Sequence, residues 1–232
     1  GFVPVMLAAV SASAVSRTFA GGAALFGIPV VTLNSFWEVP YILLLGLICG
    51  VAVATFIRLL RITAQFSHWP VVIRFCLAGC FTGTIALLIP QTLGVGYDSL
   101  SLILEGQLLL GTLLLLALCK VLATAVSCGA GLPVGLIGPS LLIGACLGGA
   151  LGEAAHVLHP DIASALPLYI AIGMAAAMGA MLNAPLAAVL AVIELTHTIS
   201  IAMPALLAIV AASLTNTGIF RQRPAYDTIL QQ

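Results

Sequence analysis

The sequence predicts an all-α membrane protein, a multi-helix bundle in which several helices are broken and cross only part of the bilayer. Hydrophobic residues make up 62% of the 232 residues, and charged residues only 6%. About 20 apolar residues in a helix span a bilayer. The charge-free runs are Val39–Ile57, Phe75–Tyr97, Gly106–Cys119, Val121–Gly152, Ile162–Ile193 and Leu195–Phe220. Because turn residues interrupt the two longest runs, we expect roughly eight to ten helical pieces.

The first interruption, Ser127–Pro139, lies inside the run Val121–Gly152. The bilayer core offers no water to unpaired backbone groups, so irregular backbone survives there only when buried in protein or lining a polar cavity. Proline suits the first turn of a helix, and Ser140–Leu158 then reads as continuous helix. Free N–H groups and the positive end of the helix dipole favour negative charge at its start. We therefore expect an anion at this terminus.

The second interruption, Asn183–Pro185, divides the run Ile162–Ile193 into two shorter helices. No long polar linker, low-complexity tract or obvious repeat separates any part of the chain. We therefore interpret residues 1–232 as a single membrane domain.

Glycine spacing predicts where helices pack closely. Gly144, Gly148 and Gly152 recur every four positions, which lets helix backbones touch in lipid. Gly135 and Gly138 differ because they precede the expected helix instead of lying within it. For these two glycines we favour a functional role.

Basic residues predict the orientation. They are concentrated near the end of the first long run and after the last one, at Arg58, Arg61, Arg74, Arg221 and Arg223. The positive-inside rule places both regions in the cytoplasm, and Trp37 and Trp69 then serve as interfacial anchors at the two ends of one span. Short linkers favour a multi-pass protein of a bacterial inner (plasma) membrane.

Composition also limits the ligands. The formal net charge is zero, which argues against nucleic acid as a partner. The cysteines lie singly in apolar segments, as expected for small buried packing residues and not for disulfides or metal ligands. We expect neither a metal nor another cofactor.

Several motifs, in their order and spacing, resemble the CLC family of chloride channels and chloride/proton exchangers, specifically the second half of its membrane domain. Gly135, Leu136, Ile137, Gly138 and Pro139 resemble the family's GxFxP anion-site motif, with Ile137 where phenylalanine is usual. Ala171–Ala180, Asn183–Leu186 and Val192–Thr196 resemble its late dimer-interface helices. Arg223–Leu230 resembles the short last helix that carries the pore tyrosine, here Tyr226.

The resemblance implies one half of a CLC-type inverted repeat, with chloride held between helix N-termini by backbone amides. Those amides would belong to Leu136 and Ile137, so the loss of the phenylalanine need not abolish binding. Tyr226 would add a phenolic O–H donor from the cytoplasmic side. The resemblance also implies a homodimer with one pore in each subunit.

The first residue, Gly1, and the apolar start indicate a piece of a longer protein. The family's serine loop and gating glutamate would lie in the missing N-terminal half of the same chain. Many exchangers carry an inward-facing glutamate where Gly22 stands here. Because glycine relays no protons, a channel is slightly favoured over an exchanger.

Lys120 and Glu194 are the charges deepest in apolar sequence. Lys120 could add positive potential for anion attraction, or its side chain could snorkel to an interface. We interpret Glu194 as structural.

Two other functions remain open on the sequence. One is a multi-pass transporter for another substrate. The other, an intramembrane hydrolase built on Ser140 and a histidine, lacks an orienting acid. An enzyme is therefore not expected.

Overall fold

A computed structural model describes residues 2–21, 26, 33, 35–160, 162–222 and 225, and these residues form helices and connecting loops with no strand. The α-helices are α1 (Phe2–Ala20), α2 (Val39–Ala64), α3 (Val71–Leu88), α4 (Tyr97–Leu104), α5 (Leu110–Gly129), α6 (Ile137–Leu158), α7 (Leu166–Leu182), α8 (Pro185–Thr196) and α9 (Ala202–Ser213). Short 3₁₀ turns are η1 (Phe36–Glu38), η2 (Gln65–His68), η3 (Pro90–Thr92) and η4 (Ile199–Ile201), and α9 continues into a π-helical turn, η5 (Leu214–Ile219).

The segments long and apolar enough to cross a bilayer confirm a multi-pass membrane fold. They are Phe36–His68, Val71–Leu88, Leu110–Gly129, Ile137–Leu158 and Ile199–Ile219. With 17 and 12 residues, α7 and α8 are shorter. At about 1.5 Å per residue, neither reaches the roughly 30 Å needed to cross the hydrocarbon core. The expected broken and partly spanning helices are therefore present.

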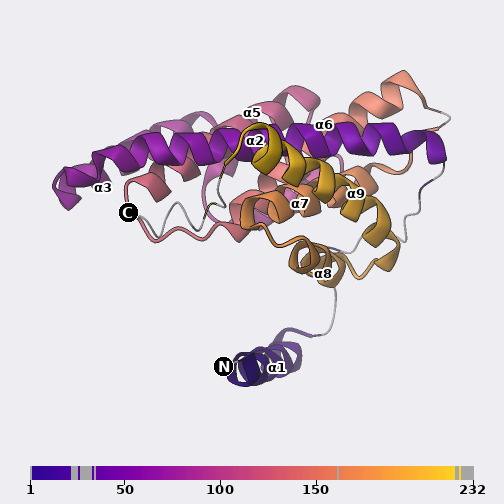
Figure 1. Cartoon of the computed structure of the whole chain (residues 1–232), viewed down its shortest axis with the longest axis horizontal. Helices are drawn as coiled ribbons and strands as arrows, with labels where there is room; N and C mark the ends of the chain where they lie inside the picture. Colours follow the sequence, from indigo (N-terminus) through magenta and orange to yellow (C-terminus); the bar gives the residue numbers. More distant parts are fainter. Residues whose placement is uncertain are drawn as a thin grey trace.

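Helix α7 is the centre of the bundle. Every residue from Leu168 to Met181 is buried, as expected for a helix that is apolar on all sides. It lies among α2, α6 and α9, while α2 runs across the whole body (Figure 1). Asn183, in the left-handed conformation with φ of 53°, ends α7 and allows α8 to start at Pro185. The predicted interruption at Asn183–Pro185 is confirmed.

Glycines set the distance between α6 and α7. A Cβ atom built on Gly144 would collide with the carbonyl oxygen of Gly173, and one built on Gly173 would collide with that of Gly144. One turn further along, Gly148 meets the backbone of Tyr169 in the same way. The two backbones therefore touch, as the four-residue spacing predicts.

A buried carboxylate ties the start of α2 to the start of α7. The Glu38 side chain is 3% exposed and accepts hydrogen bonds from the Ser164 hydroxyl at 2.7 Å and the Tyr169 hydroxyl at 2.6 Å. The Ser164 N–H donates to the same carboxylate at 3.3 Å. Three donors thus compensate a charge that would be costly to bury alone.

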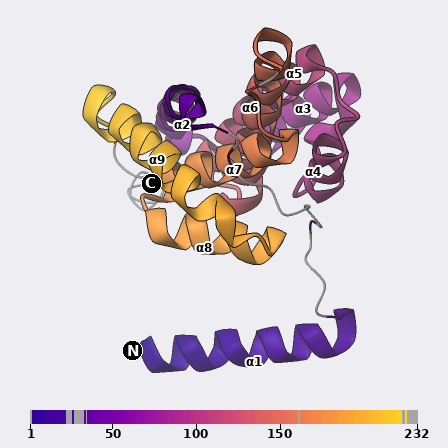
Figure 2. The same cartoon turned by 90° about the vertical axis from the view of Figure 1, so that its right-hand side faces the viewer.

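Helix α1 lies apart from the other helices in both views (Figures 1 and 2). Its described side chains, residues 3–19, are exposed. An ion pair of 3.0 Å between Arg17 and Glu194 connects it to α8. Exposed pairs of this kind contribute little stability, so this ion pair alone fixes the position of α1 only weakly.

The cysteines fit the packing interpretation only in part. Cys49, Cys128 and Cys146 are buried, whereas Cys76 and Cys80 are exposed. The expectation of burial is wrong for these two because they lie on α3, where Ala78 and Ile85 are the buried residues.

Replacing Gly144 with valine is expected to destabilise the full-length protein by about 1–3 kcal/mol, because the new side chain must separate α6 from α7. Thermal unfolding in detergent measures the change. Gly83→Val on α3 is the matched control, since a Cβ atom there has no heavy atom within 4 Å. Equal unfolding temperatures for the two variants would contradict the tight crossing.

Candidate functional site

The predicted break between α5 and α6 is present. Helix α5 ends at Gly129, and Gly131 turns the chain with φ of 88°, a value that favours glycine. The N–H groups of Gly131 and Leu132 bond back to the carbonyls of Cys128 and Ser127, at 3.0 and 3.1 Å. The chain then runs without helix to Leu136.

Helix α6 begins at Ile137, three residues before the expected start at Ser140. Pro139 is in its first turn, as predicted, and Gly138 lies within that turn instead of preceding it. The earlier start is possible because the first helical residues need no N–H acceptor inside the helix, so a proline is tolerated there.

The five motif residues differ in exposure. Leu136, Gly138 and Pro139 are buried, whereas Gly135 is exposed and Ile137 is 46% exposed. Leu136 is the N-cap residue of α6 and offers no side-chain cap. The first N–H groups of α6 therefore have no acceptor within the helix. The accessible Ile137 side chain lies beside them. Anion binding at these five residues stays a prediction.

Gly138 fixes the position of a neighbouring loop. A Cβ atom built on it would lie 2.6 Å from Cγ1 and 3.0 Å from the carbonyl oxygen of Val95, so the loop between η3 and α4 packs directly on the first turn of α6. Gly94 and Gly96 on either side of Val95 have φ of 66° and 94°. These left-handed conformations let the loop turn tightly against the motif.

Lys120 holds the same loop from the other side. Its ammonium group donates hydrogen bonds of 2.8 Å to each of the carbonyl oxygens of Thr92 and Gly94, and the residue is 3% exposed. The side chain therefore ends inside the protein on two carbonyls and does not extend to an interface. Its electrostatic role stays a prediction.

A small polar cavity of about 130 Å³ lies between this lysine and the start of α6. Its lining includes the polar residues Thr82, Thr92, Lys120, Thr124 and Ser127, together with Pro139 of the motif. The Thr92 hydroxyl is buried without a partner among the described residues, and the Thr82 and Ser127 hydroxyls are 3.3 Å apart. The cavity thus places hydroxyl groups and one cation beside the motif.

The sequence contains a signal for part of this cavity. Lys120, Thr124 and Ser127 follow one another at i, i+4 and i+7, which puts three polar residues on one face of an otherwise apolar helix. Thr82 and Thr92 had no such signal, because tertiary packing alone brings α3 and η3 to α5.

Other predicted residues lie away from this region or outside the described part. Tyr226 and Gly22 are outside the described residues. Glu194 is on the surface, in its ion pair with Arg17. The Ser140 hydroxyl is buried and donates to the carbonyl of Ile137 at 2.7 Å, an arrangement that suits helix packing and not a nucleophile. Within the described ranges, His, Cys, Asp and Glu side chains form no group of three that could hold a metal ion.

The helix that starts at Ile137, the break before it and the cavity beside it lie within a multi-pass membrane fold. Residues 1–217 match the family model described as voltage gated chloride channel. The chain therefore belongs to the CLC family.

Curated relatives include the putative chloride channel protein ClcB-like of Ralstonia nicotianae, 33% identical over 91% of this chain and 50% of its own length. Chloride channel protein CLC-f of Arabidopsis thaliana is 36% identical over 92% of this chain and 30% of its own length. The H⁺/Cl⁻ exchange transporter ClcA of Salmonella agona is 28% identical over 97% and 49%. The chain thus spans half or less of the length of these relatives.

The fold matches a crystal structure of a slow cyanobacterial Cl⁻/H⁺ antiporter with a TM-score of 0.86 at 24% identity, over 96% of this chain and 53% of that one. A eukaryotic CLC transporter structure matches with a TM-score of 0.69 over 84% and 35%. The all-α membrane fold expected from the sequence is confirmed.

Replacing Lys120 with methionine is expected to destabilise the full-length protein by about 1–3 kcal/mol, because the carbonyls of Thr92 and Gly94 would lose their buried donor. Thermal unfolding in detergent tests this. Arg58→Met, at an exposed position on α2, is expected to leave the unfolding temperature nearly unchanged. A Lys120→Met variant as stable as wild type would show that the loop does not need this lysine.

Proposed function

We propose that the protein moves chloride or another small anion across a membrane, with the backbone N–H groups of Leu136 and Ile137 forming part of the ion's path. The observation that carries this proposal is the uncapped start of α6, which lies against the loop at Val95 and beside an accessible Ile137 side chain. A dehydrated anion is attracted both by these N–H groups and by the helix dipole. The names of the relatives, which include a chloride channel protein and an H⁺/Cl⁻ exchange transporter, support the same class of substrate.

The polar cavity beside α6 supports this path. It presents the buried Lys120 residue and several hydroxyl-bearing residues in the same lining as Pro139. Neutral hydroxyl donors can bind an anion without trapping it, and a charge already bonded to two carbonyls adds attraction without direct contact. In this proposal, Tyr226 supplies a further hydroxyl from the cytoplasmic side, and the N-terminal half of the same chain supplies the rest of the path.

We favour an uncoupled channel over an exchanger. The argument is Gly22, which stands where many exchangers of the family have a proton-carrying glutamate, and glycine has no group to carry a proton. An exchanger is the alternative, supported by the H⁺/Cl⁻ exchange transporter among the relatives. The bacterial relatives favour a bacterial inner membrane as the location.

Liposomes containing the full-length protein are expected to release chloride when a counter-ion path is opened, without stoichiometric proton uptake. Tyr226→Ala is expected to change the rate or halide preference, because it removes a hydroxyl donor from the path. Chloride and proton electrodes record both fluxes together.

Coupled proton movement would contradict the channel proposal and would indicate an exchanger with another proton route. An absence of halide flux, with transport of an organic solute instead, would overturn the anion proposal itself.

We further propose that the protein is a homodimer that pairs through α8 and α9. Both helices, with the start of η5, present apolar side chains outward: Leu186, Leu190, Met203, Val210 and Leu214 are each more than half exposed. On α9 and the start of η5, the spacing from Met203 to Val210 and Leu214 forms one stripe, as expected of a helix face that packs on another helix. The motif resemblance of residues 183–196 to dimer-interface helices supports this surface.

Leu190→Trp combined with Met203→Trp is expected to shift the full-length protein from dimer to monomer, because bulky rings disturb a close helix interface. Single-molecule photobleaching in lipid bilayers counts the subunits. Leu87→Trp on α3, where the native side chain is 86% exposed, is the control expected to leave the count unchanged. A dimer that persists in the double variant would place the interface elsewhere.

A further inference from the structure

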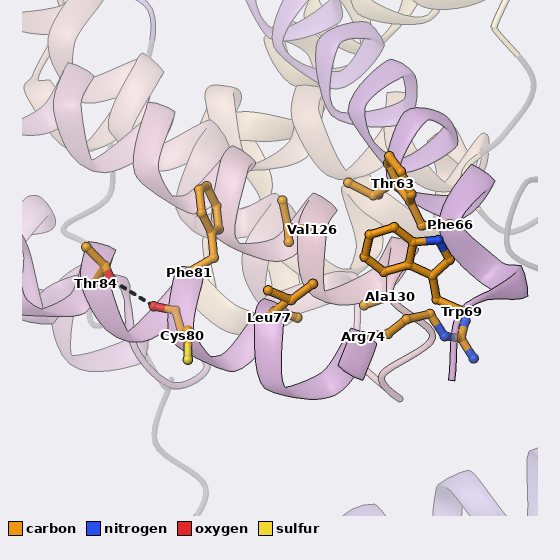
Figure 3. A pocket seen from close by; sticks show the side chains of 11 residues that line it. Thr63, Phe66, Trp69, Arg74, Leu77, Cys80, Phe81, Thr84, Val126 and Ala130 are labelled. Atoms are coloured by element: carbon orange, nitrogen blue, oxygen red, sulfur yellow. Dashed lines mark hydrogen bonds between the residues drawn. The ribbon is translucent and has the colours of Figure 1, made fainter. Parts of the chain in front are cut away.

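A second, larger pocket lies away from the start of α6. It has a volume of about 510 Å³ and is formed by the end of α2 with η2, by α3 and by α5 (Figure 3). Apolar side chains such as Leu77, Phe81 and Val126 line most of its length, and Arg74 and Trp69 lie together at one end. Its size falls within the range of about 300–1,000 Å³ typical of small-molecule sites.

The outer side of this pocket is open. Leu77 is 54% exposed, Phe81 40% and Trp69 39%, although all three line the pocket. Helices α2, α3 and α5 each belong to a segment long and apolar enough to cross the bilayer. Membrane-spanning helices are surrounded by lipid, so an acyl chain is an apolar ligand that can reach the open side.

The end of the pocket at Arg74 is suited to an anion. The Arg74 Nε atom is buried and has no acceptor, and the described residues place no carboxylate within ion-pair distance of Arg74. Arg58 and Arg61 add positive charge at the same end of α2, and they are likewise unpaired among the described residues. An unpaired guanidinium beside an apolar pocket favours a ligand with a phosphate attached to a chain.

Aromatic residues indicate the depth of this end in the membrane. Phe66 and Trp69 pack edge to face with ring centroids 5.3 Å apart, in the short connection between α2 and α3. Tryptophan beside arginines at the end of a span is typical of the interface, and the positive-inside rule makes it the cytoplasmic one. Anionic lipid headgroups are found at this level.

We infer that this pocket binds an anionic phospholipid from the cytoplasmic leaflet, with one acyl chain between α3 and α5 and the phosphate on Arg74. The site also touches the loop before α6. Ala130 lines the pocket, and a Cβ atom built on Gly131 would lie 3.5 Å from the Arg74 guanidinium. A bound lipid therefore contacts the segment that leads directly into the Gly135–Pro139 motif.

Native mass spectrometry of the full-length protein, titrated separately with palmitoyl-oleoyl phosphatidylglycerol and palmitoyl-oleoyl phosphatidylcholine, tests this inference. We expect tighter binding of phosphatidylglycerol. Arg74→Gln is expected to weaken it about fivefold or more, the effect of one cation near an anionic headgroup. Arg74→Lys keeps the charge and is expected to retain most of the preference.

Two further variants separate the parts of the site. Val126→Phe fills the pocket and is expected to weaken binding of both lipids, while leaving Arg74 in place. Arg58→Gln removes an exposed arginine that does not line the pocket, and it is expected to have a smaller effect than Arg74→Gln. Size-exclusion chromatography confirms that each variant is folded.

Equal binding of the two lipids, or an Arg74→Gln variant that binds phosphatidylglycerol like wild type, would overturn the inference. Insensitivity to Val126→Phe would also overturn it, because the chain would then lie elsewhere. The measurement requires no ion flux, so its result is independent of the proposed transport function.

Discussion

A bilayer core offers no hydrogen-bond partner to a peptide group, and this chain meets that constraint most directly between α5 and α6. The N–H groups of Gly131 and Leu132 donate hydrogen bonds to carbonyls in the last turn of α5, so these carbonyls need no water. The start of α6 has no such closure, because Leu136 provides no cap. Free donors inside a membrane protein require either packing or a ligand, and here they lie beside the accessible Ile137 side chain.

Several weak contacts combine to hold that helix start in place. Lys120 binds the carbonyls of Thr92, at the end of η3, and of Gly94 in the loop that follows, and Val95 of this loop packs against Gly138. The lysine therefore acts on the position of the motif through the backbone of this loop. The two carbonyls that the lysine holds in place also accept hydrogen bonds from its charged group. This pairing explains how a cation can be buried in such an apolar region.

Much of the fold was readable from the sequence, because charge-free runs, Gly/Pro interruptions and glycine spacing report directly on membrane helices. The breaks near Gly131 and Asn183 and the crossing at Gly144 follow from local chemistry. The partners of Lys120, the Glu38 network and the pocket between α3 and α5 did not, because they join segments far apart in the chain. The start of α6 was predicted three residues late, since a proline in the first turn does not mark which residue of the turn comes first.

The contact between Gly144 and Gly173 has a mechanical consequence. Backbones that touch leave no space for sliding, and close-packed interfaces shift between discrete arrangements instead of deforming gradually. Helices α6 and α7 are therefore expected to move as one unit, because neither backbone can shift along the other. The chain enters this pair after the glycine turn at Gly131 and leaves it at the left-handed Asn183.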